Sequence, residues 1–506
     1  MDEAGQPGTA SALTGMGKAP PAFLVDPAGA AKLGYRPPPL DPLDLADSAA
    51  HALFQTRPQH SARSALKPSP ALVAGPGLFC LGVGLAAPTL FQSLILALLL
   101  AGVTAALVWR IVAALWDVRP APAPPLADAR LPPISVLVAL HDEARVIPDL
   151  VTCLEALDYP AEQLQILFAI EADDHSTLVA ARAAVHPDRI DILAIPPIGP
   201  RTKPKALNYA LKFATGSLIA VYDAEDAPHP SQLKAAAAHL AADGRLGCVQ
   251  APLSWYNGPD NWLTRQFQLE YAVQFAAVLP LLARFNMPLP LGGTSNVFRR
   301  DALVACGAWD PFNVTEDADL GFRMARYGWR AGMIGPGTQE EAPITLTAWQ
   351  AQRSRWLKGH LVSWLVQMRD PAGLARTAGP GALASLQLTL GWNVISALLH
   401  GPSLVWALAT TLVGLAGAPG GPGLGLAVLP AGYLTGMLSA ALAARRTGTQ
   451  LRWLDILTMP AYWAMQTVAI ARALRELGAR RYWWSKTSHG VSATRREAPE
   501  WTSPPP

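Results

Sequence analysis

Three carboxylates stand close together in the segment TEDADLGFR, which spans residues 315–323. Glu316, Asp317 and Asp319 follow Thr315, a residue type that often caps the first turn of a helix. Acidic residues also favour that turn, because they interact well with the helix dipole. The three acids are therefore either an ordinary helix start or the acid or base of a catalytic site. The placement of other acids along the chain decides between these interpretations.

Acids also follow three of four short apolar runs, residues 134–140, 165–170, 190–195 and 218–223. Such runs are typical of buried parallel strands, and helical patterns separate them. We therefore predict an α/β domain with a mainly parallel sheet, in which ligands bind beyond the carboxyl ends of the strands. The acids at these ends are Asp142 and Glu143, then Glu171, Asp173 and Asp174, and finally Asp223, Glu225 and Asp226.

Three acidic strand ends in one sheet favour a crevice that holds a divalent cation and a phosphate-bearing substrate. One such acid alone would more often be an ordinary solvated loop residue. Lys203 and Lys205, in the segment TKPKALN, are the cations available to compensate the charge of a diphosphate. A solvated helix start explains these two lysines equally well.

Two long segments without charged residues predict an integral membrane protein. Of the 506 residues, 51% are hydrophobic and 15% are charged, and residues 68–109 and 377–444 contain no Asp, Glu, Lys or Arg. A helix needs about 20 apolar residues to cross a bilayer. We expect two crossings in the first segment, broken near Pro88, and two or three in the second. A buried soluble core could explain one such segment, but two of them favour membrane spans.

Basic residues flank the first apolar segment, with Arg57, Arg63 and Lys67 before it and Arg110 and Arg119 after it. By the positive-inside rule both flanks are cytoplasmic. We therefore predict a multi-pass protein of the inner (plasma) membrane, in contact with the lipid bilayer, with its catalytic domain in the cytoplasm. The net charge of +3 and the lack of a basic cluster indicate no nucleic-acid partner. The four cysteines show no CxxC spacing, so we expect free thiols and no zinc site.

The most informative helical pattern is WQAQRSRWLKGHLVSWLVQM, residues 349–368. Gln352, Arg355 and Trp356 recur at helical spacing on one face. Another face carries an apolar stripe of Leu357, Leu361, Trp364, Leu365 and Met368. We predict that this helix lies on the membrane and presents an amide, a guanidinium and an indole to the domain above. Arginine suits phosphate oxygens, and an indole can stack on a sugar. The alternative is an ordinary amphipathic surface helix.

These features together divide the chain into eight parts. They are a largely disordered or weakly folded region (1–67), two transmembrane helices (68–115), a Pro-rich linker (116–131), the α/β domain (132–345), an amphipathic interfacial helix (346–370), further transmembrane helices (377–444), an interfacial or transmembrane helix with an aromatic-rich cytoplasmic segment (451–490), and a tail (491–506).

Acidic strand ends, DAED, TED and QRSRW follow one another in this order between the apolar segments. This arrangement resembles a membrane-integrated family 2 glycosyltransferase of the cellulose synthase and hyaluronan synthase-like QxxRW type, over roughly residues 70–490. The resemblance implies a GT-A-like (Rossmann-like) domain. It also implies an inverting reaction that needs Mg²⁺ or Mn²⁺. The donor would be a nucleotide sugar, expected to be UDP-linked, and the acceptor a membrane-proximal glycan or lipid-linked molecule.

The resemblance also implies roles for individual residues. Asp317 would be the general base that takes the proton of the acceptor hydroxyl. The donor would be bound by Asp142, Glu143, Asp173, Asp174, Asp223, Gln352 and Arg355, with Lys203 as the cation available beside them. The metal would be held by Asp223 with Glu225 or Asp226, because Glu225 replaces the usual second Asp of the DxD motif. The acceptor would contact Thr294, Ser295 and Trp356.

Two questions stay open at the level of the sequence. The enzyme could extend and export a polymer, which QxxRW favours, or it could add one sugar to a lipid or lipid-linked glycan. Export or assembly subunits could be partners. A different class of protein is a non-catalytic transport or assembly subunit that keeps a degenerate nucleotide-sugar-binding domain. The intact Asp317 and QxxRW argue against this alternative.

Overall fold

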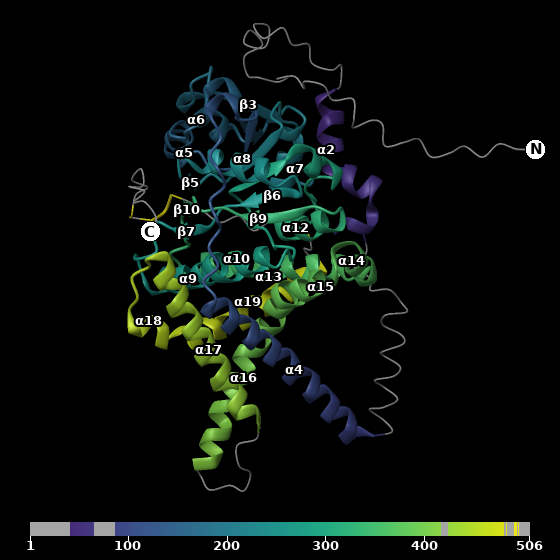
Figure 1. The fold of residues 1–506 in the computed structure, drawn as a ribbon, viewed down its shortest axis with the longest axis vertical. Helices are drawn as coiled ribbons and strands as arrows, with labels where there is room; N and C mark the ends of the chain where they lie inside the picture. The colour runs from purple at the N-terminus through teal and green to yellow at the C-terminus, as the bar shows by residue number, and fades with distance from the viewer. Residues whose placement is uncertain are drawn as a thin grey trace, which may run out of the picture.

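The computed structural model describes residues 41–64, 87–415 and 424–479, together with residues 482, 490–492 and 494. An α/β domain forms one end of the molecule, and a helical region forms the other (Figure 1).

A seven-stranded sheet with strand order β3-β2-β1-β4-β8-β6-β9 forms the centre of the α/β domain. β1 to β4 are mutually parallel where they pair, whereas β8 runs antiparallel to both β4 and β6. The predicted α/β fold with a mainly parallel sheet is therefore confirmed. The strands are β1 Ile134–Leu140, β2 Leu164–Glu171, β3 Ile190–Ile195, β4 Leu218–Tyr222, β6 Leu246–Gln250, β8 Asn296–Arg299 and β9 Arg330–Met333.

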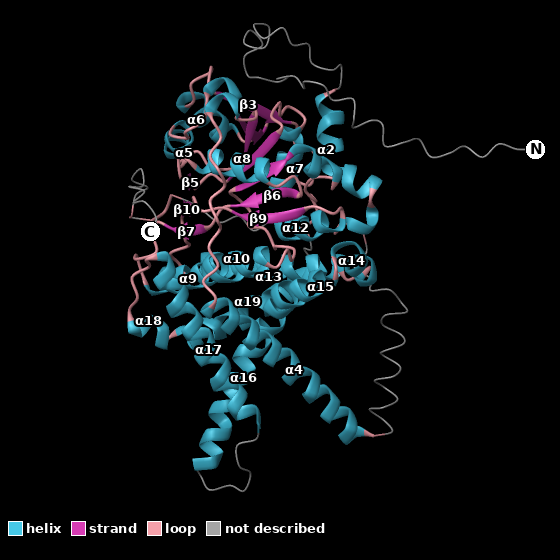
Figure 2. Cartoon of the chain, viewed as in Figure 1, coloured by secondary structure: helices cyan, strands magenta, loops and turns pink. Residues whose placement is uncertain are grey.

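Helices cover both faces of this sheet, as Figure 2 shows. Successive side chains of a strand point to opposite faces, so Val136 and Val138 join one hydrophobic cluster and Leu137 joins the other. The first cluster includes residues of α5 Ile147–Glu155, α6 His175–Ala184 and α8 Gln232–Ala242. The second includes residues of α7 Lys203–Leu211, α11 Arg300–Ala305 and α12 Glu316–Arg326.

Smaller elements separate the main sheet from the helical region. A three-stranded sheet has the order β5-β10-β7. Its strands are β5 Ala227–Pro228, β7 Leu253–Trp255 and β10 Thr338–Glu340. A continuous helical segment follows, composed of α9 Trp262–Val273, the π-helical turn η5 Gln274–Val278 and α10 Leu279–Arg284.

The apolar segments form helices that project from the α/β domain (Figure 1). They include α4 Pro88–Leu115, α16 Trp392–Leu415 and α17 Leu424–Thr447, with α14 Pro371–Ala378, α15 Pro380–Leu386 and the π-helical turn η6 Gln387–Gly391 leading into α16. α4 begins at Pro88, where a break was expected. The first of the two crossings predicted in residues 68–115 lies mostly outside the described residues.

Within the described residues, one helical run, Pro380–Trp406, is long and apolar enough to cross a membrane. Leu100–Leu115 is a shorter apolar helix. The predicted multi-pass arrangement is therefore not confirmed by the structure and stays a proposal.

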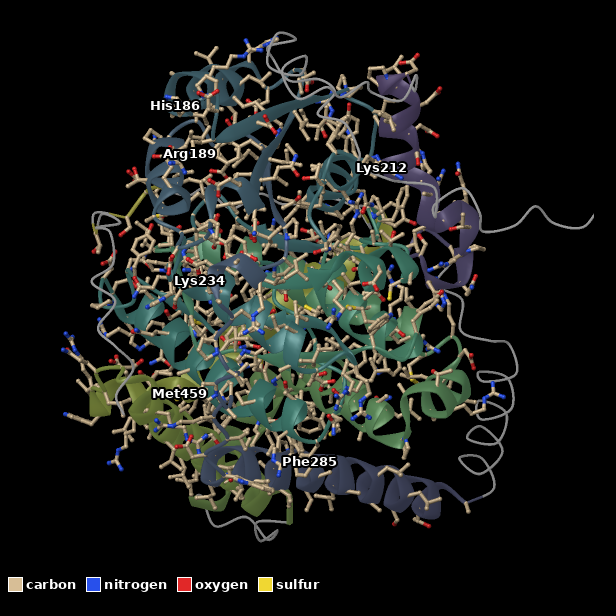
Figure 3. All side chains as sticks on the ribbon, turned by 45° about the horizontal axis from the view of Figure 1, so that its top comes forward. His186, Arg189, Lys212, Lys234, Phe285 and Met459 are labelled. Carbon is tan, nitrogen blue, oxygen red and sulfur yellow. The ribbon has the colours of Figure 1, made fainter. Side chains whose placement is uncertain are left out.

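Phe285, which directly follows α10, lies beside the C-terminal part of α4 (Figure 3). Its ring centroid lies 6.4 Å from that of Trp109 and 5.6 Å from that of Trp116.

The described part of the N-terminal region is folded, which corrects the prediction of disorder for that part. α2 Pro42–Thr56 packs on α7, where Asn208 donates hydrogen bonds to the carbonyl oxygens of Ala49 (3.0 Å) and Trp309 (2.9 Å). The buried carboxylate of Asp310 accepts from the hydroxyl of Ser61 and the backbone N–H of Ala62. Sequence composition missed this segment because its contacts are with residues more than 150 positions away.

The helix that carries QxxRW, α13 Leu346–Gln367, does not lie on a surface. Leu357 packs against residues of α16 and of α19 Met459–Ala479, whereas Trp364 packs against a separate cluster that includes α14 and α15. Lys358 forms a buried ion pair with Glu476 of α19 at 3.0 Å. These contacts do not test whether the helix lies at the level of the membrane surface, so that part of the expectation stays a prediction. The apolar stripe contacts other helices of the same chain.

Residues 451–490 contain α18 Trp453–Leu457 and α19, and α19 packs along α13. The indole N–H of Trp349 donates to the hydroxyl of Tyr462 at 3.1 Å. The linker 116–131 has no regular structure except a 3-10 turn, η3 Asp128–Arg130. These contacts fix α13 between the α/β domain and the apolar helices.

The third acid of the 315–323 segment has a structural role that can be tested. Asp319 is buried, pairs with Arg323 at 3.2 Å and accepts from Gln367 of α13 at 2.8 Å. Because Asp319→Ala leaves a buried guanidinium uncompensated, we expect it to lower the free energy of unfolding by about 3–5 kcal/mol. Denaturant unfolding of the detergent-purified protein measures this. Glu155→Ala, at an exposed helical position, is the control; equal stability of the two variants would contradict the assignment.

Candidate active site

A cavity of about 320 Å³ lies between the carboxyl edge of the sheet and the helical region. We refer to it as the catalytic cavity. Its wall on the α/β side includes Lys203, Asp223 and Asp317, and its wall on the helical side includes Trp356 and His360 of α13. The sheet and the helical region therefore build this space together.

The DAED turn after β4 brings two of its acids into the catalytic cavity. Asp223 and Glu225 line it, whereas Asp226 does not. Asp226 is fully buried, and its carboxylate accepts from the backbone N–H of Asp223 (2.7 Å) and the hydroxyl of Thr294. Burial, together with the charges of Asp223 and Glu225, raises the pKa of Asp226 well above its ordinary value. Asp226 therefore braces the turn, and Glu225 faces the cavity beside Asp223.

Lys203, at the start of α7, is the cation nearest these acids. It forms an ion pair with Asp223 and donates to the carbonyl oxygen of Gly293 at 2.5 Å. Burial alone would lower the pKa of Lys203, but the charges of Asp223 and Glu316 outweigh this and raise it. Lys205 instead pairs with Glu171 at 2.8 Å, outside the lining of the cavity. The helix start therefore gives one lysine to the site and one to the core.

The TED segment places two acids at the first turn of α12. Burial raises the pKa of Asp317 to about 6, although the backbone N–H of Ala318 and the charge of Lys203 act in the opposite direction. Burial and the charge of Asp317 raise the pKa of Glu316 to about 8. Burial thus raises the pKa values of both acids, and that of Asp317 stays the lower of the two.

Gly293 marks the point on which the charged groups converge. A Cβ atom at this position would lie 3.1 Å from Oδ2 of Asp317, 3.6 Å from Nζ of Lys203 and 3.9 Å from Oδ2 of Asp223. Thr294 also lines the cavity. Ser295 does not, because its buried hydroxyl donates to Thr338 at 2.6 Å. The absence of a side chain at Gly293 leaves room for a ligand among the three groups.

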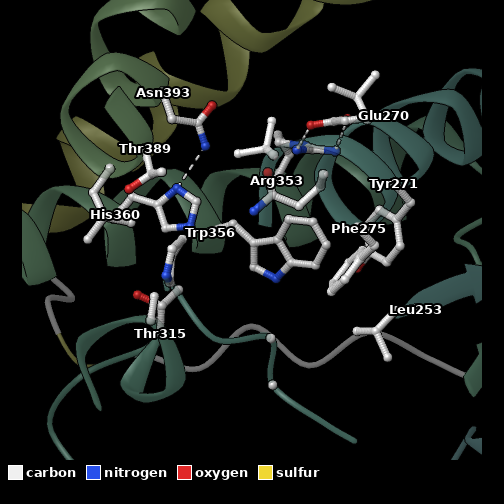
Figure 4. A pocket seen from close by; sticks show the side chains of 18 of the residues that line it. Leu253, Glu270, Tyr271, Phe275, Thr315, Arg353, Trp356, His360, Thr389 and Asn393 are labelled. Carbon is white, nitrogen blue, oxygen red and sulfur yellow. Dashed lines mark hydrogen bonds and ion pairs between the residues drawn. The ribbon is translucent and has the colours of Figure 1, made fainter. Parts of the chain in front are cut away.

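All three QxxRW residues, Gln352, Arg355 and Trp356, line the catalytic cavity. Burial lowers the pKa of Arg355, and the charges of Glu316 and Asp317 oppose this shift. Trp356 occupies the middle of the cavity wall, between His360 and the aromatic side chains of α9 and η5 (Figure 4). Its ring is stacked with that of Tyr271, with centroids 6.2 Å apart and an angle of 26°.

Four predicted donor-binding residues lie at the ends of β1 and β2 and do not belong to the cavity lining found among the described residues. Asp173 pairs with Arg201 at 2.7 Å. Asp174 caps α6 and accepts the backbone N–H of Asp142. Burial would raise the pKa of Asp174, but the hydrogen bonds that its carboxylate accepts from Asp142, Thr177 and Ser176 lower it overall. A role in binding the nucleotide stays a prediction for Asp142, Glu143, Asp173 and Asp174.

The structure adds functional candidates that the sequence did not reveal. Glu340 of β10 lines the cavity, and its pKa is raised well above the ordinary value by burial and by the charges of Asp226 and Glu225. Arg353 binds Glu270 through two hydrogen bonds of 2.7 Å, and His360 contacts Asn393 at 2.8 Å (Figure 4). Arg353 occupies one of the unspecified positions of QxxRW, and no motif marks Glu340 or His360.

Within the described residues, no group of three or more His, Cys, Asp or Glu side chains is arranged to enclose a metal ion. Mg²⁺ is usually bound by one or two carboxylates together with substrate phosphates and water. The adjacent pair Asp223 and Glu225 fits such a site. The buried carboxyl groups of Asp226 and Glu340 each keep one oxygen without a hydrogen-bond partner in the described part of the structure.

The convergence at Gly293 leads to a prediction. Gly293→Ala places a methyl group 3.1 Å from Asp317, so the carboxylate must move by a few tenths of an ångström. Because catalysis is sensitive to small displacements, we expect turnover of a nucleotide sugar to fall roughly tenfold without loss of stability. Gly335→Ala is the matched control, since nothing lies within 4 Å of its Cβ. Unchanged turnover in the Gly293 variant would contradict the assignment of the space beside Gly293 to the reaction centre.

Comparison with known proteins now adds to the geometry. Residues 132–359 match the family model described as "Glycosyltransferase like family 2". The beta-monoglucosyldiacylglycerol synthase of Nostoc sp. (strain PCC 7120 / SAG 25.82 / UTEX 2576) is 30% identical over 256 residues, 49% of this chain and 54% of that protein. The probable glycosyltransferase YdaM of Bacillus subtilis (strain 168) is 27% identical over 236 residues, 46% of this chain and 56% of that protein. The chain thus spans about half the length of the curated relatives it matches.

Among solved structures, the mannosyltransferase PcManGT from Pyrobaculum calidifontis, in complex with GDP-Man and Mn²⁺, is 21% identical with a TM-score of 0.48. The alignment covers 76% of this chain and 98% of that one. The narrower resemblance to cellulose and hyaluronan synthases stays a prediction. Residues 132–359 thus match the family 2 glycosyltransferase model, and the curated relatives that match this part of the chain are named as glycosyltransferases or glycolipid synthases.

Proposed function

We propose that the protein transfers a sugar from a nucleotide sugar to a hydroxyl group of a lipid acceptor at the membrane, with inversion of configuration. The observation that carries this proposal is the catalytic cavity. It brings Asp317 together with Asp223, Lys203 and Arg355, and it continues to the apolar helices α4 and α16. A donor with a charged diphosphate and an acceptor with a hydrocarbon part could therefore meet in one space.

In the proposed reaction, Asp317 takes the proton of the acceptor hydroxyl. The acceptor oxygen attacks the anomeric carbon while the bond between that carbon and the diphosphate oxygen breaks. A single displacement from the opposite side inverts the configuration. Lys203 and Arg355 stabilise the negative charge of the leaving diphosphate, because both cations line the cavity beside Asp317.

Metal dependence is part of the proposal. Asp223 and Glu225 would hold Mg²⁺ or Mn²⁺ together with the diphosphate of the donor. When bound, the metal ion supplies charge compensation for the leaving group. The geometry favours Glu225 over Asp226 as the second ligand, since Asp226 is buried beneath the turn and bonded to Thr294.

A lipid acceptor is proposed on two grounds. The beta-monoglucosyldiacylglycerol synthases among the relatives are named for a glycolipid product. The side of the cavity away from the sheet is built from the apolar helices α4, α16 and α17. We therefore propose single addition to a lipid rather than extension of a polymer. The same proposal places the protein in the inner membrane with several spans and its α/β domain in the cytoplasm. It disfavours a non-catalytic subunit, which would have no need of the converging acids and cations.

The base can be tested by substitution and by pH. Asp317→Asn should lower turnover by about 10²- to 10⁴-fold, because general-base catalysis contributes on that scale. Donor affinity, measured by calorimetry, should stay nearly unchanged. The ionised form of Asp317 is active, so in the wild type kcat/KM should rise as pH increases through about 6 and fall below it. Turnover within a few-fold of wild type in the Asn variant would exclude Asp317 as the base.

Metal dependence gives a second test. Transfer should stop in excess chelator and return with Mg²⁺ or Mn²⁺, because the diphosphate needs charge compensation. Glu225→Gln should raise the metal concentration required for half-maximal activity. Asp226→Asn keeps the hydrogen bond from Thr294 and should affect stability more than metal requirement. Full activity in chelator, or the opposite behaviour of the two variants, would contradict the proposed site.

A further inference from the structure

A second cavity, of about 260 Å³, adjoins the catalytic cavity on the side away from the sheet. We refer to it as the apolar cavity. It lies between α4, α16, α17 and α19, where α4 and α16 diverge from each other (Figure 1). The residues that line both cavities are Ala106, Arg110, Trp392, Ser396, His400 and Trp463. A molecule could therefore extend from one cavity toward the other along this shared wall.

Two regularly spaced helix faces build the apolar cavity. On α4 the lining residues recur every three or four positions at Leu100, Val103, Leu107 and Arg110. On α16 they do the same at Trp392, Ser396, Leu399, Ser403 and Trp406. Such spacing places each set on a single face of its helix. The two faces look toward each other without closing, since Leu399 and Trp406 keep 38% and 48% of their surface exposed.

The chemistry of this lining selects a hydrocarbon occupant. Leu100, Val103, Leu107 and Leu399 offer no hydrogen bond to a sugar hydroxyl. Apolar surface that leaves water contributes about 25 cal/mol per Å², so a hydrocarbon chain gains by covering these side chains. A growing polysaccharide would instead need hydrogen-bonding partners along its whole path. The lining also holds Ser396, Ser403 and Tyr433, but most of its surface is apolar, which favours a lipid chain over a glycan.

Arg110 stands at the boundary, since it lines both cavities. Charged side chains in a membrane helix are rare and generally face an interior cavity or a functional partner. Glu270 lines the catalytic cavity only. Its carboxylate accepts two hydrogen bonds of 2.7 Å from Arg353 and one of 2.7 Å from Tyr462. The boundary therefore carries excess positive charge, which suits the oxygen atoms of a lipid head group.

We propose that the apolar cavity binds an acyl chain of a glycerolipid acceptor and that Arg110 binds the ester or phosphate oxygens of its head group. The acceptor hydroxyl then points into the catalytic cavity, toward Asp317. This inference rests on the proposed function and adds to it the class of the acceptor and the place of its chain. Arg110 acts here as a substrate-binding residue, and Gly432 of α17 lies in the wall around the chain.

The first test fills the apolar cavity. A Cβ atom on Gly432 would meet only Leu107 within 4 Å, at 3.8 Å, so Gly432→Phe projects a ring into open space. Leu434→Phe is the matched control, because Leu434 lies on the same helix, is 64% exposed and lines neither cavity. The full chain is placed in phosphatidylcholine vesicles with dioleoylglycerol, or is assayed in solution with the short-chain dihexanoylglycerol. Hydrolysis of the donor by water is recorded in parallel.

We expect Gly432→Phe to lower transfer to dioleoylglycerol at least about tenfold, as blocking of a hydrocarbon pocket does. Transfer to dihexanoylglycerol and hydrolysis of the donor should match those of Leu434→Phe. Equal losses with both acceptors, or no loss with either, would overturn the inference while leaving the proposed function in place. If the wild type hydrolyses the donor but glycosylates no lipid, the proposed function itself fails.

A binding measurement that needs no turnover keeps the two claims separate. Diacylglycerol with a photoactivatable group in its chain should crosslink to α4 or α16 in the wild type and in Leu434→Phe, but not in Gly432→Phe. Crosslinking that is absent from the wild type would overturn the inference, whatever the activity.

The charge at the boundary is tested with Arg110→Gln against Arg119→Gln, an exposed arginine in the linker. The first should raise KM for the lipid, and the second should leave that KM unchanged. If Arg110→Gln raises KM more for phosphatidylglycerol than for dioleoylglycerol, Arg110 binds the phosphate group. If KM rises equally for both lipids, Arg110 binds the ester oxygens that the two lipids share. Unchanged KM in Arg110→Gln would overturn the role of this residue.

Discussion

The burial of several carboxylates around Lys203 and Arg355 is the constraint on which the rest of the structure depends. Burial first, and then repulsion between neighbouring carboxylates, raises the pKa values of Asp226, Glu316 and Glu340. Only fixed cations and hydrogen bonds make such a cluster tolerable. The groups that hold it come from the turn after β4, the starts of α7 and α12, and α13. The position of each of these elements must therefore be fixed by contacts outside the catalytic cavity.

α13 shows how that placement is achieved. One of its faces delivers Arg355 and Trp356 to the catalytic cavity, and its other sides are held by α19, α16 and the acid Asp319 of α12. A helix lying loosely on a bilayer could not hold a guanidinium at a fixed position beside Asp317. The buried helix also joins the α/β domain to the apolar helices, and α4, α16 and α19 supply the wall that the catalytic and apolar cavities share.

The sequence was sufficient to predict the parallel sheet, because alternating short apolar runs and helical patterns admit few other folds. It also identified Asp223, Asp317 and Arg355, which the structure brings into one cavity. It could not show that Asp226 is buried and Glu225 faces the cavity, because the position of Asp226 depends on a hydrogen bond from Thr294, 68 positions away. Likewise, apolar residues of α13 have the same pattern whether they face lipid or protein. Arg110 was interpreted only as a flanking charge, since its position between two cavities depends on helices far away in the chain.

The central claim is that one cavity unites nucleotide-sugar chemistry with a lipid acceptor. Product analysis tests it most directly. The purified full chain, in vesicles that contain glycerolipids, is incubated with a panel of radiolabelled UDP- and GDP-sugars, and the organic-soluble products are identified by mass and by anomeric configuration. The account predicts one lipid that carries a single sugar, with the configuration inverted relative to the donor. A water-soluble polymer as the only labelled product, or a lipid product with retained configuration, would contradict it.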